Sequence, residues 1–382
     1  MTKAAELAKM GEVITNDQIG GRRNMIINGG MQVAQRGTSL AMAHDGNTAN
    51  FLIDRYQLLF GGSPSSLDGT YAQVADHPLS ANGKSLKWTT GTTESAIAAD
   101  EQLFIVHKIE AQDLQHLNFG SSNALTTSLS FYVKSSITGT FSISLRKDDT
   151  TKRISNRTYT INSANTWEKK TFTFTGDTDS GAEIVNDNGE GIRIMWHLMA
   201  GSNSVGGGNF TSWKDYAADD FAAGLATNAI ATTSGATWQL ADCQWEVGSQ
   251  VTPFEHRSYG EELQLCQRYF EIMFRGSNAQ NGTQKTTVGA GVWYGANQVL
   301  ATMLYSPKRA QPTITQSETG ALGAYGNSYF RTSTDSTPFD SITETGCRLN
   351  IGSFNASGTA GDGVFAMLVN PNSSSVSIDA EL

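Results

Sequence analysis

Short runs in which apolar and polar residues alternate are the feature that most constrains how this chain can fold. They recur from residue 24 onward, and turn-rich segments such as residues 61–66 (GGSPSS) and 187–191 (DNGEG) separate them. An apolar period of two is typical of half-buried antiparallel strands, because successive side chains of a strand point to opposite faces. Many such strands with few helices predict a two-sheet sandwich of the jelly-roll type over residues 24–258. The apolar positions of the clearest runs are Leu129, Phe131 and Val133; Phe141, Ile143 and Leu145; Phe172 and Phe174; Ile192, Ile194, Trp196 and Leu198; and Ala241, Cys243, Trp245 and Val247.

A domain boundary is expected near Arg257. Ser258 is placed to cap a short helix that runs from residue 259 to about residue 268, with two glutamates in its first turn. Strand patterns return after this helix, which predicts a second, smaller β domain over residues 259–382. The fold class is therefore all-β. The strands expected in the second domain are residues 288–294, 298–305, 363–370 and 376–382.

The first 23 residues form a third part of the chain. Residues 2–10 are the best helix candidate, because Ala, Leu and Met predominate there, and Gly11 ends the pattern. A helix this short is marginal by itself, so it needs a partner surface on another subunit or on a larger assembly. Gly20 and Gly21 then interrupt the chain. Residues 1–23 are accordingly expected to be a helical docking segment.

Composition and charge exclude several classes of protein. Of 382 residues, 38% are hydrophobic and only 16% are charged, and the net charge is −9. A chain without a basic field is a poor partner for nucleic acid.

Cys243, Cys266 and Cys347 form no CxxC pair, so neither a disulfide framework nor a zinc site is expected, and folding in a reducing cytoplasm is the simplest interpretation. The chain contains neither a signal-peptide pattern nor a run of roughly 18 apolar residues, which predicts a soluble protein without membrane insertion.

No catalytic signature is present. The sequence lacks HExxH, GxSxG, a P-loop and a GxGxxG that follows a strand. The six histidines are scattered, and His197 lies on the polar side of an alternating run, where we expect a surface imidazole. Paired carboxylates of the kind a glycosidase needs can be drawn from any chain with 36 acidic residues, so they carry no evidence for a hydrolase. We expect a protein without catalytic activity and without a cofactor.

Residues 177–190 (DTDSGAEIVNDNGE) concentrate carboxylate and amide oxygens, which are the ligands that calcium prefers. The segment lacks the spacing of a defined calcium loop. A solvated turn is the favoured interpretation, and a calcium site is the alternative.

Aromatic residues gather in one segment that has no strand period. Residues 206–221 contain Phe210, Trp213 and Tyr216 among amides and carboxylates. Proteins hold sugars by apolar contact with exposed rings and by hydrogen bonds from neighbouring polar groups. The three residues are therefore the candidate carbohydrate-binding residues. The alternative is that the segment folds back and that Trp213 closes one end of the sandwich.

Two motifs far apart in the chain carry a resemblance to a known family. The first is residues 20–37 (GGRRNMIINGGMQVAQRG), followed by residues 51–56 (FLIDRY). The second is residues 240–247 (LADCQWEV), then 252–255 (TPFE) and 259–269 (YGEELQLCQRY), and the terminal IDAEL also fits. In this order they closely resemble bacteriophage tail-fibre-like virion proteins. Trp245 and Tyr56 stand where members often carry Leu and Trp, and both are apolar exchanges.

The resemblance implies a jelly roll similar to carbohydrate-binding modules, set in a homo-oligomer, usually a trimer, on the virion. It implies no chemistry. The expected partners are other virion proteins, through residues 1–23, and host surface polysaccharide, and the expected location is the phage tail. Two alternatives remain open: a polysaccharide depolymerase with sites at subunit clefts, and a purely structural adaptor or decoration protein.

The polar residues of the first motif have a simple structural interpretation. Asp54 and Arg55 are expected to anchor backbone groups or to form an ion pair. The amide and guanidinium side chains are expected to satisfy buried backbone groups where the chain enters the sandwich. We favour these roles over ligand contact for Asn24, Asn28, Gln32, Gln35 and Arg36.

Overall fold

The computed structural model of the chain describes residues 22–44, 50–62, 64–208, 210–275, 286–327, 329–368 and 375–382. The chain divides into two units, unit 1 (Met1–Glu262 with Leu382) and unit 2 (Leu263–Glu381). The expected helix at residues 2–10 and the Gly20-Gly21 break lie outside the described residues. No helix within the described residues is long and apolar enough to cross a membrane.

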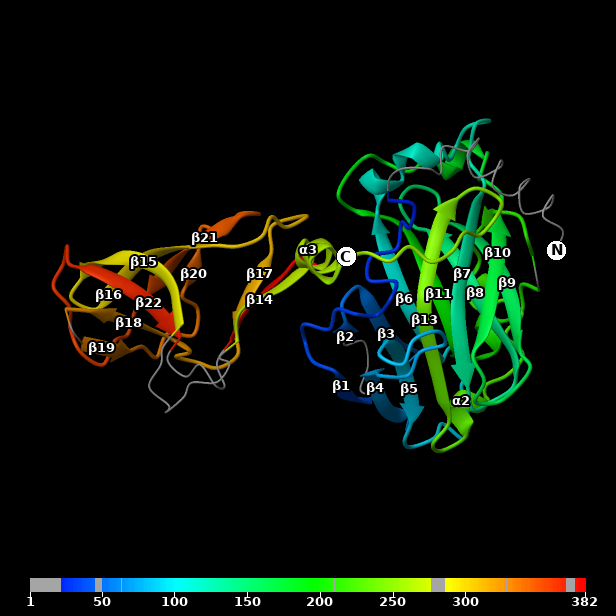
Figure 1. Cartoon of the computed structure of the whole chain (residues 1–382), viewed down its shortest axis with the longest axis horizontal. Coiled ribbons are helices and arrows are strands. Elements are labelled where there is room, and N and C mark those ends of the chain that lie inside the picture. The colour runs from blue at the N-terminus through cyan, green and yellow to red at the C-terminus, as the bar shows by residue number, and fades with distance from the viewer. Residues whose placement is uncertain are drawn as a thin grey trace. The chain divides into compact units, whose positions relative to one another are not determined.

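Unit 1 is a sandwich of two antiparallel sheets (Figure 1). The chain crosses between the sheets repeatedly, as it must in a jelly roll. The first sheet has the order β1 (Ser39–Ala43), β4 (Asp68–Val74), β5 (Ser85–Thr90), β13 (Thr237–Val247), β7 (Thr127–Ser135) and β10 (Glu168–Phe174). The second has the order β12 (Lys214–Asp215), β9 (Arg153–Ile161), β8 (Gly139–Lys147), β11 (Glu190–Ala200), β6 (Gln102–Glu110), β3 (Tyr56–Gly61) and β2 (Asn50–Ile53). Short helical turns connect them: η1 (Ala111–Leu117), η2 (Ser180–Ala182), η3 (Ser202–Ser204), η4 (Ala218–Asp220) and α2 (Ala229–Thr232).

The alternating runs supply the core of unit 1, as predicted. The apolar positions of β7, β8 and β11 are fully buried between the two sheets, and Trp88, Trp196, Trp238 and Trp245 fill the space among them. Burial of these side chains on one face of each strand is what a period of two requires.

The alternation along β13 is interrupted, which the sequence pattern does not indicate. A β-bulge between Ala241 and Gln244 shifts the register against β7, and Asp242 has φ 49°. Because one extra residue inverts the phase of a strand, Leu240, Cys243 and Trp245 belong to the core cluster, whereas Ala241 is buried outside it. The prediction that residues 241, 243, 245 and 247 share one face is therefore wrong at Ala241.

His197 is also placed differently from the prediction, because its ring is fully buried. Its Nε2 lies 2.8 Å from the Ser144 hydroxyl, and the Phe221 ring packs edge-on against the imidazole. Burial, with a contribution from Arg146, lowers the pKa of His197 to about 3. The polar side of β11 is thus covered, and the histidine is a neutral packing residue.

The predicted short helix is present as α3 (Tyr259–Gln267). Ser258 caps it, since its hydroxyl accepts a hydrogen bond from the Glu261 N–H at 3.3 Å. Cys266 on this helix is fully buried. The division between the two units falls inside this helix.

Unit 2 is built from two antiparallel sheets. The smaller has the order β14 (Phe270–Arg275), β23 (Ser375–Asp379) and β17 (Thr313–Gln316). The larger has the order β19 (Tyr329–Thr332), β18 (Leu322–Gly326), β22 (Gly363–Leu368), β15 (Thr286–Gly295), β16 (Gln298–Leu304), β21 (Gly346–Ile351) and β20 (Phe339–Asp340). The four strands predicted here are confirmed as β15, β16, β22 and β23, but β16 ends before residue 305 and β23 ends before residues 380–382. Val376 and Ile378 of the small sheet share one core with the inner face of the large sheet.

Candidate functional site

Residues 24–33 of the first motif, here called the seam, lie along the edge of β13. β5 pairs with β13 only over residues 237–240, and beyond that point the segment from residue 24 takes over the same edge. The Met25 N–H donates to Trp245 O at 2.8 Å, and the Cys243 N–H donates to Gly29 O at 2.9 Å. Backbone groups that an open strand edge would leave unpaired are thereby satisfied.

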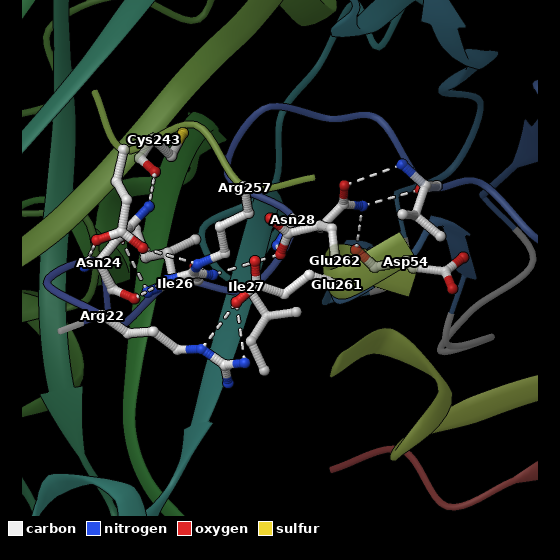
Figure 2. A network of polar contacts seen from close by, with 12 residues as sticks. Arg22, Asn24, Ile26, Ile27, Asn28, Asp54, Cys243, Arg257, Glu261 and Glu262 are labelled. Atoms are coloured by element: carbon white, nitrogen blue, oxygen red, sulfur yellow. Dashed lines mark hydrogen bonds and ion pairs between the residues drawn. The ribbon is translucent and has the colours of Figure 1, made fainter. Parts of the chain in front are cut away.

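Asn24 continues this pairing with its side chain (Figure 2). Its Nδ2 donates to Cys243 O at 2.9 Å, and its Oδ1 accepts from the N–H groups of Ile26 and Trp245, both at 3.0 Å. The neighbouring position 29 must be glycine, because a Cβ there would lie only 2.2 Å from Cys243 O. The amide therefore replaces one rung of a β ladder.

Asn28 fixes the other end of the seam. Its Nδ2 donates to Val33 O at 2.8 Å and to Asp54 O at 2.9 Å, and its Oδ1 accepts from the Val33 N–H at 3.0 Å. The Asp54 carboxylate accepts from the Gln35 N–H at 2.9 Å, and Arg55 donates to Lys108 O. The backbone-anchoring roles predicted for Asn24, Asn28, Asp54 and Arg55 are confirmed.

Two further residues of the first motif behave otherwise. Gln32 is exposed and donates to Gly30 O at 2.8 Å, so it satisfies no buried group. The Arg36 guanidinium lies over the Phe51 ring, 5.3 Å from its centroid.

Residues of the second motif and Arg257, which follows its TPFE segment, form hydrogen bonds and ion pairs with the first motif and with each other. The Glu255 carboxylate accepts from the N–H groups of Arg23 and Asn24 at 2.6 and 3.1 Å. Arg257, whose side chain is 4% exposed, pairs with Glu255 at 2.8 Å and Glu262 at 3.4 Å. It also donates to the carbonyl oxygens of Asn24 and Ile26, as Figure 2 shows. Asn24, Glu255 and Arg257 therefore hold the two motifs together.

The predicted carbohydrate-binding residues lie in the segment around β12. Trp213 is 9% exposed, packs edge-on against Phe119 and donates its Nε1–H to Thr175 O at 2.8 Å. This burial favours the alternative that Trp213 closes the sandwich. Tyr216 stacks with Arg146 and packs partly against the core, and Lys214 lies over the Phe210 ring. Sugar binding by Phe210, Trp213 and Tyr216 stays a prediction.

Acidic residues of the segment 177–190 have partners within the chain, and Arg153 pairs with both Asp177 and Asp179. Arg153 binds both oxygens of Asp177, at 2.8 and 2.9 Å, while Asp179 caps η2 and Asp187 accepts from the Gly189 N–H. Within the described ranges, no three His, Cys, Asp or Glu side chains form a group that could hold a metal ion. The geometry lends the calcium alternative no support.

An exposed aromatic surface lies in unit 2 instead, on the outer face of the seven-stranded sheet. Phe365 is 51% exposed and Tyr325 is 41% exposed, and the two pair directly across β22 and β18. Val292, 44% exposed, lies on the same face of β15. The residues on either side of Phe365 along the strand, Val364 and Ala366, are buried in the core.

The strand registers extend this pair into a cross-strand row that reaches every strand of the sheet. Six strand spacings of roughly 4.8 Å give the row a width of about 29 Å. In spatial order its members are Phe330, Tyr325, Phe365, Ala290, Thr302, Arg348 and Asp340.

The polar end of the cross-strand row is linked by hydrogen bonds. Arg348 binds both oxygens of Asp340, at 2.6 and 2.8 Å, and these hydrogen bonds hold the pKa of Asp340 below its usual value. Gln298 donates to Asn350, which donates to the same carboxylate. The rings and the Arg348–Asp340 pair thus lie on the same open surface, with Ala290 and Thr302 between them.

The sequence predicts the strand at 363–370 but not its exposed aromatic residue. Residues 363–368 read GVFAML, which is apolar at both phases of the period of two, so periodicity could not orient it. Pairing of Phe365 with Tyr325, forty residues earlier, depends on the sheet order.

Comparisons with known proteins place the chain only coarsely. No family model and no curated protein matches it. Among solved structures, the enzymatically active domain of tailspike protein 4 from bacteriophage CBA120 aligns over 59% of this chain and 21% of that one, with 11% identity and a TM-score of 0.30. A putative sugar-binding protein from Bacteroides thetaiotaomicron aligns over 59% and 100% of the two chains, with 10% identity and a TM-score of 0.32. A family 11 carbohydrate-binding module from Clostridium thermocellum aligns over 58% and 99%, with 10% identity and a TM-score of 0.26. Values this low do not assign a function.

Proposed function

We propose that the chain is a non-enzymatic attachment protein of a phage virion, of the tail-fibre type, that binds host surface glycans through the outer face of unit 2. The observation that carries the proposal is the cross-strand row, in which the exposed rings of Tyr325 and Phe365 continue into Thr302, Arg348 and Asp340. The motif resemblance to tail-fibre-like proteins supports the virion role.

The chemistry of this face suits a polyhydroxylated ligand. A pyranose presents a C–H face to an aromatic ring and hydroxyl groups to its sides. The bidentate Arg348–Asp340 pair and Asn350 offer donors and acceptors at a fixed distance along the same surface. A single open site of this kind binds weakly, and three copies in a homotrimer would raise avidity without tight individual sites.

The test is binding of the full chain to a glycan array and to purified host polysaccharide. The double variant Tyr325→Ala with Phe365→Ala should weaken binding about tenfold or more, since each ring contributes roughly 0.5–1.5 kcal/mol and 1.4 kcal/mol is a factor of ten. Tyr329→Ala is the matched control, because Tyr329 is exposed on β19 but precedes Phe330 and so points to the opposite side of the sheet. Equal binding by all three proteins would refute the proposed site.

The same samples separate the alternatives. A depolymerase would shorten the host polysaccharide during incubation, which size-exclusion chromatography would detect. A structural adaptor would bind no glycan at all. The exposed aliphatic residues Val292 and Leu304 give this second outcome some physical basis, because such side chains also serve protein contacts.

Docking to the particle through the N-terminal segment is tested separately. Deletion of residues 1–21 keeps Arg23, whose N–H group binds Glu255. We expect a folded homotrimer, by light scattering, that fails to join the virion. A monomeric product would instead make the segment an oligomerisation element.

A further inference from the structure

A second candidate site lies in unit 1, far along the chain from the cross-strand row. It is a pocket of about 320 Å³ between the seam, the connection from β4 to β5, the bulge of β13 and the start of α3. This volume is at the lower end of the roughly 300–1,000 Å³ typical of ligand sites. The pocket therefore suits a small ligand or the end of a chain.

Asp242 is the unusual residue of this pocket. It sits in the bulge with φ 49°, a left-handed conformation that Asp adopts more readily than most non-glycine residues. Its side chain is 3% exposed, and Oδ1 lies 3.0 Å from His77 Nε2. Oδ2 is buried and has no hydrogen-bond partner among the described residues. A buried carboxylate oxygen without a partner is costly, so a ligand that donates a hydrogen bond there is favoured.

The orientation of His77 supports this assignment. Its Nδ1 accepts from the Leu79 N–H at 3.1 Å, so the hydrogen of the neutral ring is on Nε2 and points at Asp242. The imidazole occupies one oxygen of the carboxylate and holds the side chain in place. The second oxygen is left for another donor.

The other residues that line the pocket restrict the class of ligand that it can bind. Asp242, Glu255 and Glu262 outnumber the single guanidinium, Arg257, which the two glutamates and two backbone carbonyls already engage. An anionic ligand is therefore disfavoured. Phe254 and the 60% exposed Tyr259 provide apolar ring surface. Rings together with an acceptor that lacks a donor fit a neutral sugar residue.

We propose that this pocket binds a neutral sugar residue, whose hydroxyl groups donate to Asp242 Oδ2 and whose C–H face packs on Phe254 and Tyr259. The proposal rests on the proposed glycan-binding function but concerns a separate site. It would give each chain two points of attachment to one polysaccharide.

The experiment is saturation-transfer NMR and calorimetry on the full chain with D-glucose, D-galactose, D-mannose and N-acetyl-D-glucosamine at millimolar concentration. At least one neutral sugar should bind, and D-glucuronate should bind about tenfold more weakly than D-glucose if glucose is the ligand. Asp242→Asn should reduce binding about tenfold, and Asp219→Asn, at an exposed acid elsewhere in unit 1, should leave it unchanged. Tyr259→Ala removes an exposed ring and guards against misfolding of the first variant; it should reduce binding severalfold.

Two results would overturn the proposal: no transfer to any neutral sugar, or sugar binding that neither Asp242→Asn nor Tyr259→Ala weakens. The double variant at Tyr325 and Phe365 distinguishes the two sites. If it abolishes sugar binding while both pocket variants retain it, the proposed function stands and the pocket assignment fails. If the pocket variants alone lose binding, the face of unit 2 is not the site.

Discussion

The seam of unit 1 and the outer face of unit 2 depart in opposite directions from the rule that polar residues face water and apolar residues face the core. At the seam, Asn24 and Asn28 are buried, as is the side chain of Arg257 that binds the seam backbone, and each of the three has several partners. On the outer face, Phe365 and Tyr325 are exposed, although their strand neighbours fill a core. Both regions break the binary pattern, but only the seam compensates with hydrogen bonds inside the chain.

The difference teaches where to look for function. A buried polar residue whose hydrogen-bonding groups are all paired within the chain stabilises the fold and has no group left to bind a ligand. Exposed rings are only partly packed within the chain and can contact a ligand. A contiguous exposed apolar patch therefore marks an interaction surface. The hydrogen-bonded Asn24 and Asn28 of the first motif are therefore less available for binding than the exposed rings of unit 2. Substitutions in the two regions should differ in the same way.

The largest expected effect is that of Arg257→Ala. The change leaves Glu255 and Glu262 without their buried counter-charge and two carbonyls without a donor, which should destabilise unit 1 by about 3–5 kcal/mol. Chemical denaturation followed by tryptophan fluorescence measures it. Arg348→Ala is the matched control on the outer face, where the ion pair is exposed and should leave the unfolding midpoint unchanged. Equal losses would show that burial does not separate the two regions.

The next effect concerns the paired glycines of the seam. Gly29→Ala would place a Cβ 2.2 Å from Cys243 O, a backbone atom that cannot move alone, and should cost about 1–3 kcal/mol. Gly30→Ala is its control, because the nearest atoms to that Cβ are in the Phe254 ring at 3.6 Å, an ordinary contact. Thermal unfolding of the two variants should differ clearly. Similar melting temperatures would mean that the seam is loosely packed.

A smaller effect should appear in the pH dependence of stability. Burial alone would raise the pKa of Glu255, but hydrogen bonds from the N–H groups of Asn24 and Arg23 and the charge of Arg257 hold it below its usual value of 4.5. A carboxyl group whose pKa is depressed in the folded state stabilises the fold above its unfolded pKa. That stability is lost as pH falls below about 4.5. Glu255→Gln should flatten the melting temperature between pH 5 and 3 more than Asp340→Asn does. The reverse ranking would contradict the importance of the seam.

The sequence was sufficient for several strands and for the role of Asn24 and Asn28, since both follow from local rules. A period of two located β7, β8 and β11, and the chemistry of Asn24 and Asn28 predicted that they would bind backbone groups. The bulge at Asp242 was invisible, because one extra residue in a strand leaves no mark in composition. The pocket that depends on this bulge could not be predicted either.

The other features that the sequence did not predict depend on contacts between residues far apart in the chain. Arg257 contacts Asn24 across 233 residues, and nothing in either motif states that they meet. The burial of His197 depends on a covering residue, Phe221, from a later segment. The GVFAML strand was equally apolar at both phases, so its exposed face emerged only from the sheet order. Tertiary placement, which local patterns do not encode, decided each case.

The smallest expected effect completes the comparison. Tyr325→Ser with Phe365→Ser should change the stability of unit 2 by only about 0.5 kcal/mol per site, because these side chains are 41% and 51% exposed and lose less than core side chains when they are shortened. The result would show that the rings are not retained for folding, which leaves binding as their physical role. A different outcome is equally informative. A drop in melting temperature that grows as the protein is diluted would indicate that the face is covered by another copy of the chain, since only a subunit contact makes stability depend on concentration. The cross-strand row would then be an assembly surface, and the glycan would have to be sought in the pocket at Asp242.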